Sequence, residues 1–289
     1  MKQVDISPSS PASTCKAWGA FLSPPIFVGT PLDMNALKQQ NNICRAFVKA
    51  LDTVYKGRQV VVSREGLVVL AEAQRATAVR LLNEIMAVLI LRSVSVNGIR
   101  ETDLVECYID TVNKEIDSER WSYKAGNQAL PERRFEGWDA RFYHPDNIRS
   151  FMRRAELMTG HPTVRKDLRL LLEAYTSHQE SAFTTSLLLS WLGIVRLLEA
   201  KWRPLAEQRQ GDNGVENATS DPSWSTGRLI EDLRLCNAIN DSVYQEAKRL
   251  YEKHSNLIRS DEETTFGESE SCFHFFLSQL RKTLTSEEP

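Results

Sequence analysis

The sequence has few cysteines and histidines, five of each in 289 residues, and neither kind forms a metal-binding pattern. The cysteines are odd in number and widely spaced, with no C-x-x-C pair, and the H-E-x-x-H motif is absent. This spacing excludes a disulfide framework or a zinc module as the basis of the fold. We therefore expect no bound metal.

Glycine-rich phosphate-binding motifs are also missing. The 13 glycines never fall into G-x-x-x-x-G-K-[ST] or G-x-G-x-x-G, and no nucleophile elbow is present. These absences remove the common nucleotide-dependent enzymes and serine hydrolases from consideration. We expect no cofactor.

Long hydrophobic runs and an excess of one charge are absent as well. The longest uncharged runs, residues 17–32 and 181–195, are shorter than the roughly 20 apolar residues of a membrane span. Pro24 and Pro25 interrupt any signal-peptide core near the start. The net charge of -2 provides no overall basic field for nucleic acid. We expect a cytoplasmic protein without membrane contact, and RNA binding would need a local basic patch.

Apolar residues at helical spacing predict a mainly α protein with minor β. Residues 1–30 are rich in proline and serine and are interpreted as a flexible arm. Residues 31–135 form an N-terminal accessory region, helical with minor β, and residues 140–289 form an antiparallel helical bundle.

Within the accessory region, the spacing predicts helices over residues 31–55 and 67–91, with a strand or hairpin around Val61. Residues 85–91 are apolar on every side and should be buried. In the bundle, Asp146 is expected to cap a helix that Gly160 ends, Pro162 to start the next, and Pro204 to end a third.

A basic, aromatic-containing segment spans residues 131–169, with nine cations against six acids. Arginines can neutralise phosphates while aromatic side chains stack on bases. Within it, we expect Arg149, Arg153 and Arg154 to contact RNA. The alternative is a solvated linker followed by an ordinary amphipathic helix.

Three stretches of the C-terminal half resemble the helices of HEPN domains, particularly the Apea-like group. They are DLRLLLEAY at residues 167–175, SLLLSW at 186–191 with the following LLE and Trp202, and LYEKHSNLIRS at 250–260. The resemblance covers roughly residues 145–285. It implies an all-α bundle, a homodimer, and a metal-independent endoribonuclease of a toxin or antiviral defence system, acting through an arginine and a histidine.

The candidate catalytic residues are His254, Arg249 and Arg259. Alignment on the tyrosine-containing stretch places His254 where the family has arginine, and Arg259 where it has histidine. Either the pair works in reverse order, or the site has decayed, or Arg249 acts with His254 in a shifted register. A histidine could move protons at the 2'-hydroxyl while an arginine neutralises the phosphate.

The alternative function is a catalytically inactive helical dimerisation module that binds RNA or a protein partner. The reversed order of the two residues favours it. His254 also continues the apolar stripe of Val243, Ala247 and Leu250, where a histidine is more often a core residue than a catalyst.

Overall fold

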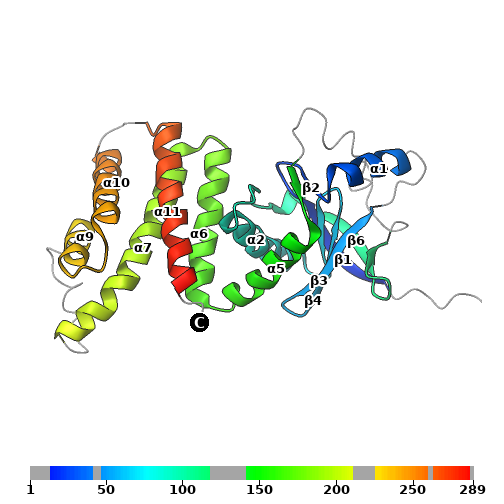
Figure 1. Ribbon diagram of the computed structural model, residues 1–289, viewed down its shortest axis with the longest axis horizontal. Coiled ribbons are helices and arrows are strands. Elements are labelled where there is room, and N and C mark those ends of the chain that lie inside the picture. Colours follow the sequence, from blue (N-terminus) through cyan, green and yellow to red (C-terminus); the bar gives the residue numbers. More distant parts are fainter. Residues whose placement is uncertain (1–13, 42–46, 118–140, 211–224, 260–262, 287–289) are drawn as a thin grey trace, which may run out of the picture. The chain divides into compact units, whose positions relative to one another are not determined.

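The computed structural model describes residues 14–41, 47–117, 141–210, 225–259 and 263–286 (Figure 1). They divide into two compact units, residues 1–165 and residues 166–289. The first unit is a mixed sheet and helix structure, whereas the regular elements in the described part of the second unit are all helices. The expected boundary near residue 140 thus lies one helix before the division.

The first unit is built on a six-stranded antiparallel sheet with the order β3-β4-β5-β1-β6-β7. Its strands are β1 (Thr14–Phe21), β3 (Lys49–Tyr55), β4 (Arg58–Ser63), β5 (Leu67–Leu70), β6 (Val105–Asp110) and β7 (Glu115–Ile116). The two end strands, β3 and β7, also touch each other. The sheet therefore curls into a nearly closed barrel.

A cluster of small and β-branched side chains fills the inner face of this sheet. Residue burial alternates along β6, and Cys107 and Ile109 point inward together with Ala17 of β1 and Val69 of β5. The missing side chain of Gly19 lets the residues of this cluster pack closely, because a Cβ there would lie 3.1 Å from side-chain atoms of Leu67 and Val69. Branched apolar residues suit such a pleated, buried surface.

The prediction of a mainly α fold with minor β is wrong, because this six-stranded sheet dominates the N-terminal half. The flexible-arm prediction fails for β1 and β2 (Ile26–Val28), which lie inside residues 1–30. The helix predicted over 31–55 is α1 (Pro31–Asn41) followed by strand β3. The helix predicted over 67–91 begins only at α2 (Arg75–Leu91), after β5.

Two turns explain why β3 and β5 are strands, although the sequence predicted helices over both segments. Lys56 and Gly57 both have positive φ, 48° and 73°, in the hairpin between β3 and β4. Two such residues make the turn whose twist matches antiparallel strands. Val61 lies in β4, so the expected hairpin is present. The other strand of this hairpin is β3, which lies in a segment that was predicted to be helical. Gly66, with φ 77°, allows the second turn, into β5.

Helices α2 and α5 (Pro145–Thr159) cover the sheet, α2 against β5 and α5 against both β3 and α2. Residues 85–91 of α2 are all buried, which confirms that prediction. Helix α5 ends before Gly160 as expected, but its N-cap is His144 rather than Asp146. A short strand, β8 (Arg141–Tyr143), pairs in parallel with β2 and leads into α5.

A polar network around Glu84 joins these elements inside the first unit. The buried Glu84 carboxylate accepts a 2.7 Å hydrogen bond from the Tyr55 hydroxyl and pairs with Lys56 and Arg80. Arg165 lies 3.7 Å from the same carboxylate and donates to the carbonyl of Thr159. Burial raises the pKa of Tyr55, so its hydroxyl stays a proton donor.

The second unit is a bundle of five described helices. They are α6 (Pro162–Gln179), α7 (Phe183–Gln210), α9 (Thr226–Leu235), α10 (Asp241–Arg259) and α11 (Phe266–Ser286). Helix α7 is central, with α9, α10 and α11 all packed against it (Figure 1). Helix α6 starts at Pro162 as predicted, whereas α7 continues past Pro204 instead of ending there.

Helix α7 is also long and apolar enough, by length and composition alone, to cross a bilayer. The central helix of a folded bundle meets the same criteria, and α7 packs closely against α11. The property is therefore weak support for a membrane span.

Candidate functional site

The predicted catalytic histidine, His254, lies on α10 and faces α7. Its ring is 5.7 Å from the indole of Trp191, at an interplanar angle of 33°. Trp191 is almost completely buried and also contacts the ring of Tyr251. Partial burial lowers the pKa of His254, because the charged imidazolium is less well solvated there. The imidazole is therefore neutral at physiological pH and rests on an aromatic surface.

Arg249 lies on another side of α10 and is already engaged. Its Nε and Nη2 donate to both carboxylate oxygens of Glu246, at 3.0 and 2.5 Å, and Nη2 also donates to Ser271 Oγ at 2.9 Å. The Arg249 guanidinium lowers the pKa of Glu246, which stays ionised. The positive charge of Arg249 is thus largely balanced by a neighbouring carboxylate.

The structure does not assemble the predicted catalytic group. A five-residue step turns Arg249 about 140° away from His254 around the helix axis. Arg259 is exposed and is the last residue of α10. Within the described part of the chain, no hydrogen bond or ion pair connects His254 to either arginine.

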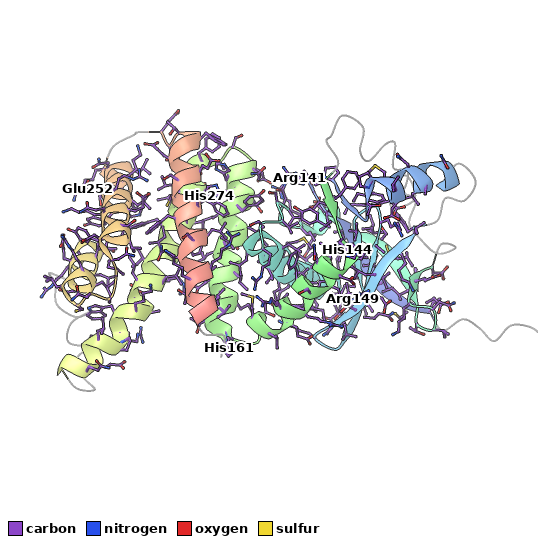
Figure 2. All side chains as sticks on the ribbon, in the orientation of Figure 1. Arg141, His144, Arg149, His161, Glu252 and His274 are labelled. Carbon is purple, nitrogen blue, oxygen red and sulfur yellow. The ribbon has the colours of Figure 1, made fainter. Side chains whose placement is uncertain are left out.

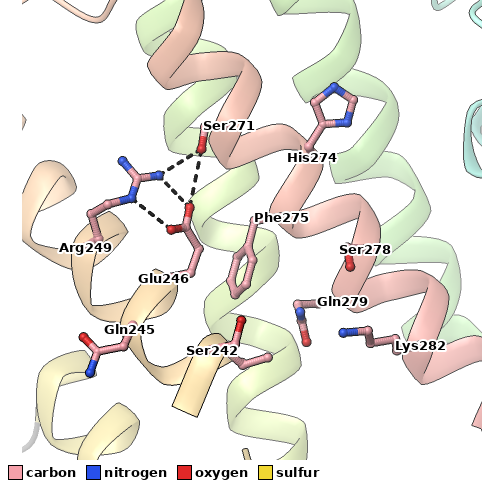
Figure 3. A pocket seen from close by; sticks show the side chains of 11 residues that line it. Ser242, Gln245, Glu246, Arg249, Ser271, His274, Phe275, Ser278, Gln279 and Lys282 are labelled. Atoms are coloured by element: carbon pink, nitrogen blue, oxygen red, sulfur yellow. Dashed lines mark hydrogen bonds and ion pairs between the residues drawn. The ribbon is translucent and has the colours of Figure 1, made fainter. Parts of the chain in front are cut away.

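A polar groove runs between α10 and α11 and includes Arg249 (Figure 3). Its volume is about 750 Å³, and it is open to solvent. Phe275 points into its middle, with Arg249 near one end and Lys282 near the other. The groove was missed in the sequence, because α11 contributes its residues from beyond position 270, far from Arg249 along the chain.

A second candidate is an exposed basic surface, which we define as Arg141, Phe142, His144, Arg149 and Arg153. Figure 2 labels three of its members, on β8 and at the start of α5. Within residues 141–153 the sequence has three arginines against one acid, Asp146, which pairs with Arg149 at 2.6 Å. Arg141, His144 and Arg153 are exposed, and Phe142 is 37% exposed.

The fold positions this surface through buried anchors. The ring of Phe142 lies 5.7 Å from that of the fully buried Phe27. Ile148 and Met152 bury the inner face of α5. Arg149 and Arg153, four residues apart, consequently share the outer face.

The three predicted RNA-binding residues do not all lie together. Arg149 and Arg153 share the outer face of α5, where Arg153 is exposed and Arg149 is half-buried, whereas Arg154, also half-buried, lies one residue further around the helix. Other members of the predicted basic segment, including Arg133 and Arg134, lie outside the described residues. Arg141 and His144 could have been found from the sequence, since both flank the predicted start of the helix.

The described residues contain no cluster of three or more histidine, cysteine or acidic side chains that could hold a metal ion. Comparison with protein-family models, with curated proteins and with solved structures gives no match for this chain. The resemblance to HEPN domains therefore remains a prediction.

Proposed function

We propose that this protein binds RNA and does not cleave it. The observation that carries the proposal is the engagement of Arg249 by Glu246 and Ser271, while His254 lies against Trp191. An acid-base group must reach the proton it transfers, and a charge-stabilising group must reach the same phosphate. Two groups on different sides of one helix do not meet this requirement.

The balanced charge of Arg249 is a further argument against catalysis. A guanidinium that already forms a two-point pair with a carboxylate adds little stabilisation to a dianionic phosphate, unless Glu246 moves away. The reversed order of His254 and Arg259 relative to HEPN domains agrees with a site that has lost its chemistry. The proposal therefore favours the binding alternative over the ribonuclease.

The basic surface supports RNA as the ligand. Arg141 and Arg153 provide exposed contacts for phosphates, Arg149 adds a third when a phosphate displaces Asp146 from it, and the partly exposed ring of Phe142 provides a face on which a base can stack. Stacking requires an unpaired base, so the favoured target is single-stranded RNA. Sequence preference is expected to be modest, because phosphate contacts and stacking accept every base.

The test is an electrophoretic shift of labelled single-stranded RNA in EDTA, followed by a denaturing gel of the same mixture. We expect a shifted complex and intact RNA. The double variant Arg149→Glu with Arg153→Glu should abolish the shift, while Arg203→Glu with Lys248→Glu, an equal change of charge at exposed sites in the second unit, should retain it. Cleavage by the purified native chain that is lost in His254→Ala would overturn the proposal in favour of the nuclease.

A further inference from the structure

The α10–α11 groove has the size of a small-molecule site. Its volume of about 750 Å³ falls within the roughly 300–1,000 Å³ typical of such sites. Helices α10 and α11 form its walls, and α7 passes behind them (Figure 3). The largest group of side chains along it is polar and uncharged, and consists of Ser242, Gln245, Ser271, Ser278 and Gln279. Such a lining suits a ligand that presents several uncharged polar groups.

The side-chain amide of Gln279 is the clearest sign that the groove holds a ligand. Gln279 is only 5% exposed, and its side chain extends from α11 into the groove (Figure 3). Among the described residues, no group forms a hydrogen bond with this amide. An amide that is buried without a partner is unfavourable, because it has lost most of its contact with water. A ligand hydroxyl can both donate to it and accept from it, and would satisfy it.

A hydrogen-bond acceptor and a donor are held together nearer the other end of the groove. The Arg249 guanidinium lowers the pKa of Glu246, so the carboxylate is ionised and accepts hydrogen bonds. Within the described part of the chain, Glu246 Oε2 accepts only from Arg249 Nε, and Arg249 Nη1 has no partner. Two neighbouring hydroxyls of one ligand can therefore bind this pair, one donating to Glu246 and the other accepting from Arg249.

An aromatic ring lies between these two polar places. Phe275 points into the middle of the groove and is only partly buried (Figure 3). The face of an aromatic ring is electron-rich and attracts the slightly positive C–H groups of a saturated ring. Phe275 thus offers an apolar contact to a ligand whose edges are polar.

The charges along the groove favour a neutral ligand. An anion would lie near the Glu246 carboxylate and a cation near Arg249, and each would be repelled by the like charge. Lys282 also lines the groove, but it has interactions of its own, and a neutral ligand needs no charge from it. Sugars combine the required features, since they are uncharged, carry neighbouring hydroxyls and have a ring with C–H faces.

We propose that the α10–α11 groove binds a neutral sugar of one or two rings, with a ring face on Phe275 and hydroxyls at Gln279 and at the Glu246–Arg249 pair. The site lies in the second unit and uses none of the residues assigned to RNA. Sugar binding can therefore fail while RNA binding by Arg149 and Arg153 holds, and the reverse.

The experiment is a titration of the full chain with neutral sugars, followed by saturation-transfer nuclear magnetic resonance. The panel consists of glucose, galactose, mannose, N-acetylglucosamine, maltose, cellobiose and lactose. Sorbitol is the control ligand, because it carries comparable hydroxyls but has no ring. We expect saturable binding of at least one sugar, and weaker binding of sorbitol, which cannot place a ring face on Phe275.

Two variants test the contacts. Gln279→Leu removes the buried amide and should weaken binding of the best sugar about fivefold or more, without loss of stability, since no protein hydrogen bond is broken. Phe275→Leu keeps an apolar side chain but removes the aromatic face, and should weaken binding about threefold or more. Gln208→Leu, the same substitution at an exposed position of α7, is the matched control and should bind like the native chain.

Three outcomes would overturn the assignment. One is the absence of saturable binding by every sugar of the panel. Another is sorbitol binding as tightly as the best sugar, which would remove any contribution of the ring face. The last is unchanged affinity in either Gln279→Leu or Phe275→Leu, when circular dichroism shows the native helix content in that variant.

Discussion

Gly193 of α7 lies directly against the ring of Phe276 of α11. A Cβ at this position would be 2.2 Å from Cζ of Phe276, which is fully buried and cannot move aside without displacing other core residues. The close approach of α7 and α11 therefore depends on the missing side chain at position 193. Glycine is tolerated in the middle of the helix because the packing gained exceeds its cost in helix propensity.

Gly193→Ala should destabilise the second unit despite the better helix propensity of alanine. Overpacking of a filled core costs about 1–3 kcal/mol, and this clash is severe enough to expect the upper part of that range. The free energy of unfolding in urea, followed by circular dichroism, measures the effect. Gly267→Ala is the control, because a Cβ there meets nothing within 4 Å. Equal stability of the two variants would contradict this account of the α7–α11 contact.

The salt dependence of RNA binding should report the contacts of the basic surface. On a single strand, each arginine that contacts a phosphate contributes about 0.7 to the slope of log affinity against log salt concentration. The double variant Arg149→Ala with Arg153→Ala should therefore lower that slope by about 1.4. Fluorescence anisotropy between 50 and 300 mM salt measures it. An unchanged slope would place the RNA elsewhere on the protein.

Acidic pH should destabilise the protein through His254 and His178. Burial is the main cause that lowers both pKa values below 6.5 in the folded chain. The unfolded chain then binds more protons as the pH falls through about 6.5, so folded stability is full above that pH and decreases below it. His254→Phe keeps a ring against Trp191 but cannot titrate. We expect the unfolding midpoint in urea to fall less between pH 7.5 and 5.5 in this variant, and an identical fall would contradict the assignment.

Glu84→Gln should destabilise the first unit. The amide keeps the shape but removes the negative charge that faces Lys56, Arg80 and Arg165. Breaking a buried charge pair costs about 3–5 kcal/mol, and partial exposure of these cations places the expected loss near the lower end. Chemical denaturation measures it, with the exposed Glu101→Gln as the control. A loss equal to that of Glu101→Gln would show that the network contributes nothing to stability.

Helices that carry their own start and stop residues were predictable from the sequence. Pro162 begins α6, Gly160 follows α5, and the apolar run 85–91 is buried on every side of α2. Each of these signals acts within one or two helical turns. Local rules therefore sufficed for them.

The strands were missed because their cause is not local. Leu67 and Leu70 have helical spacing, yet β5 forms because β1 and β4 pair with it on both sides. The predicted pairing of Arg249 with His254 failed for the same reason, because sequence spacing does not show contacts with distant residues. The five-residue step from Arg249 to His254 suggested a pair, whereas the partners of Arg249 are Glu246 on its own helix and Ser271 on a distant one.

The contact between β3 and β7 has a consequence for the behaviour of this protein at high concentration. The ammonium group of Lys49 of β3 lies 3.8 Å from the carboxylate of Glu115 of β7 and donates a hydrogen bond to the carbonyl of Asn113. The two edge strands of the sheet therefore cover each other. Exposed rims of sheets recruit strands from other molecules, which leads to aggregation. Because the two edge strands of this sheet contact each other, few of their unpaired backbone groups are available for pairing with neighbouring molecules.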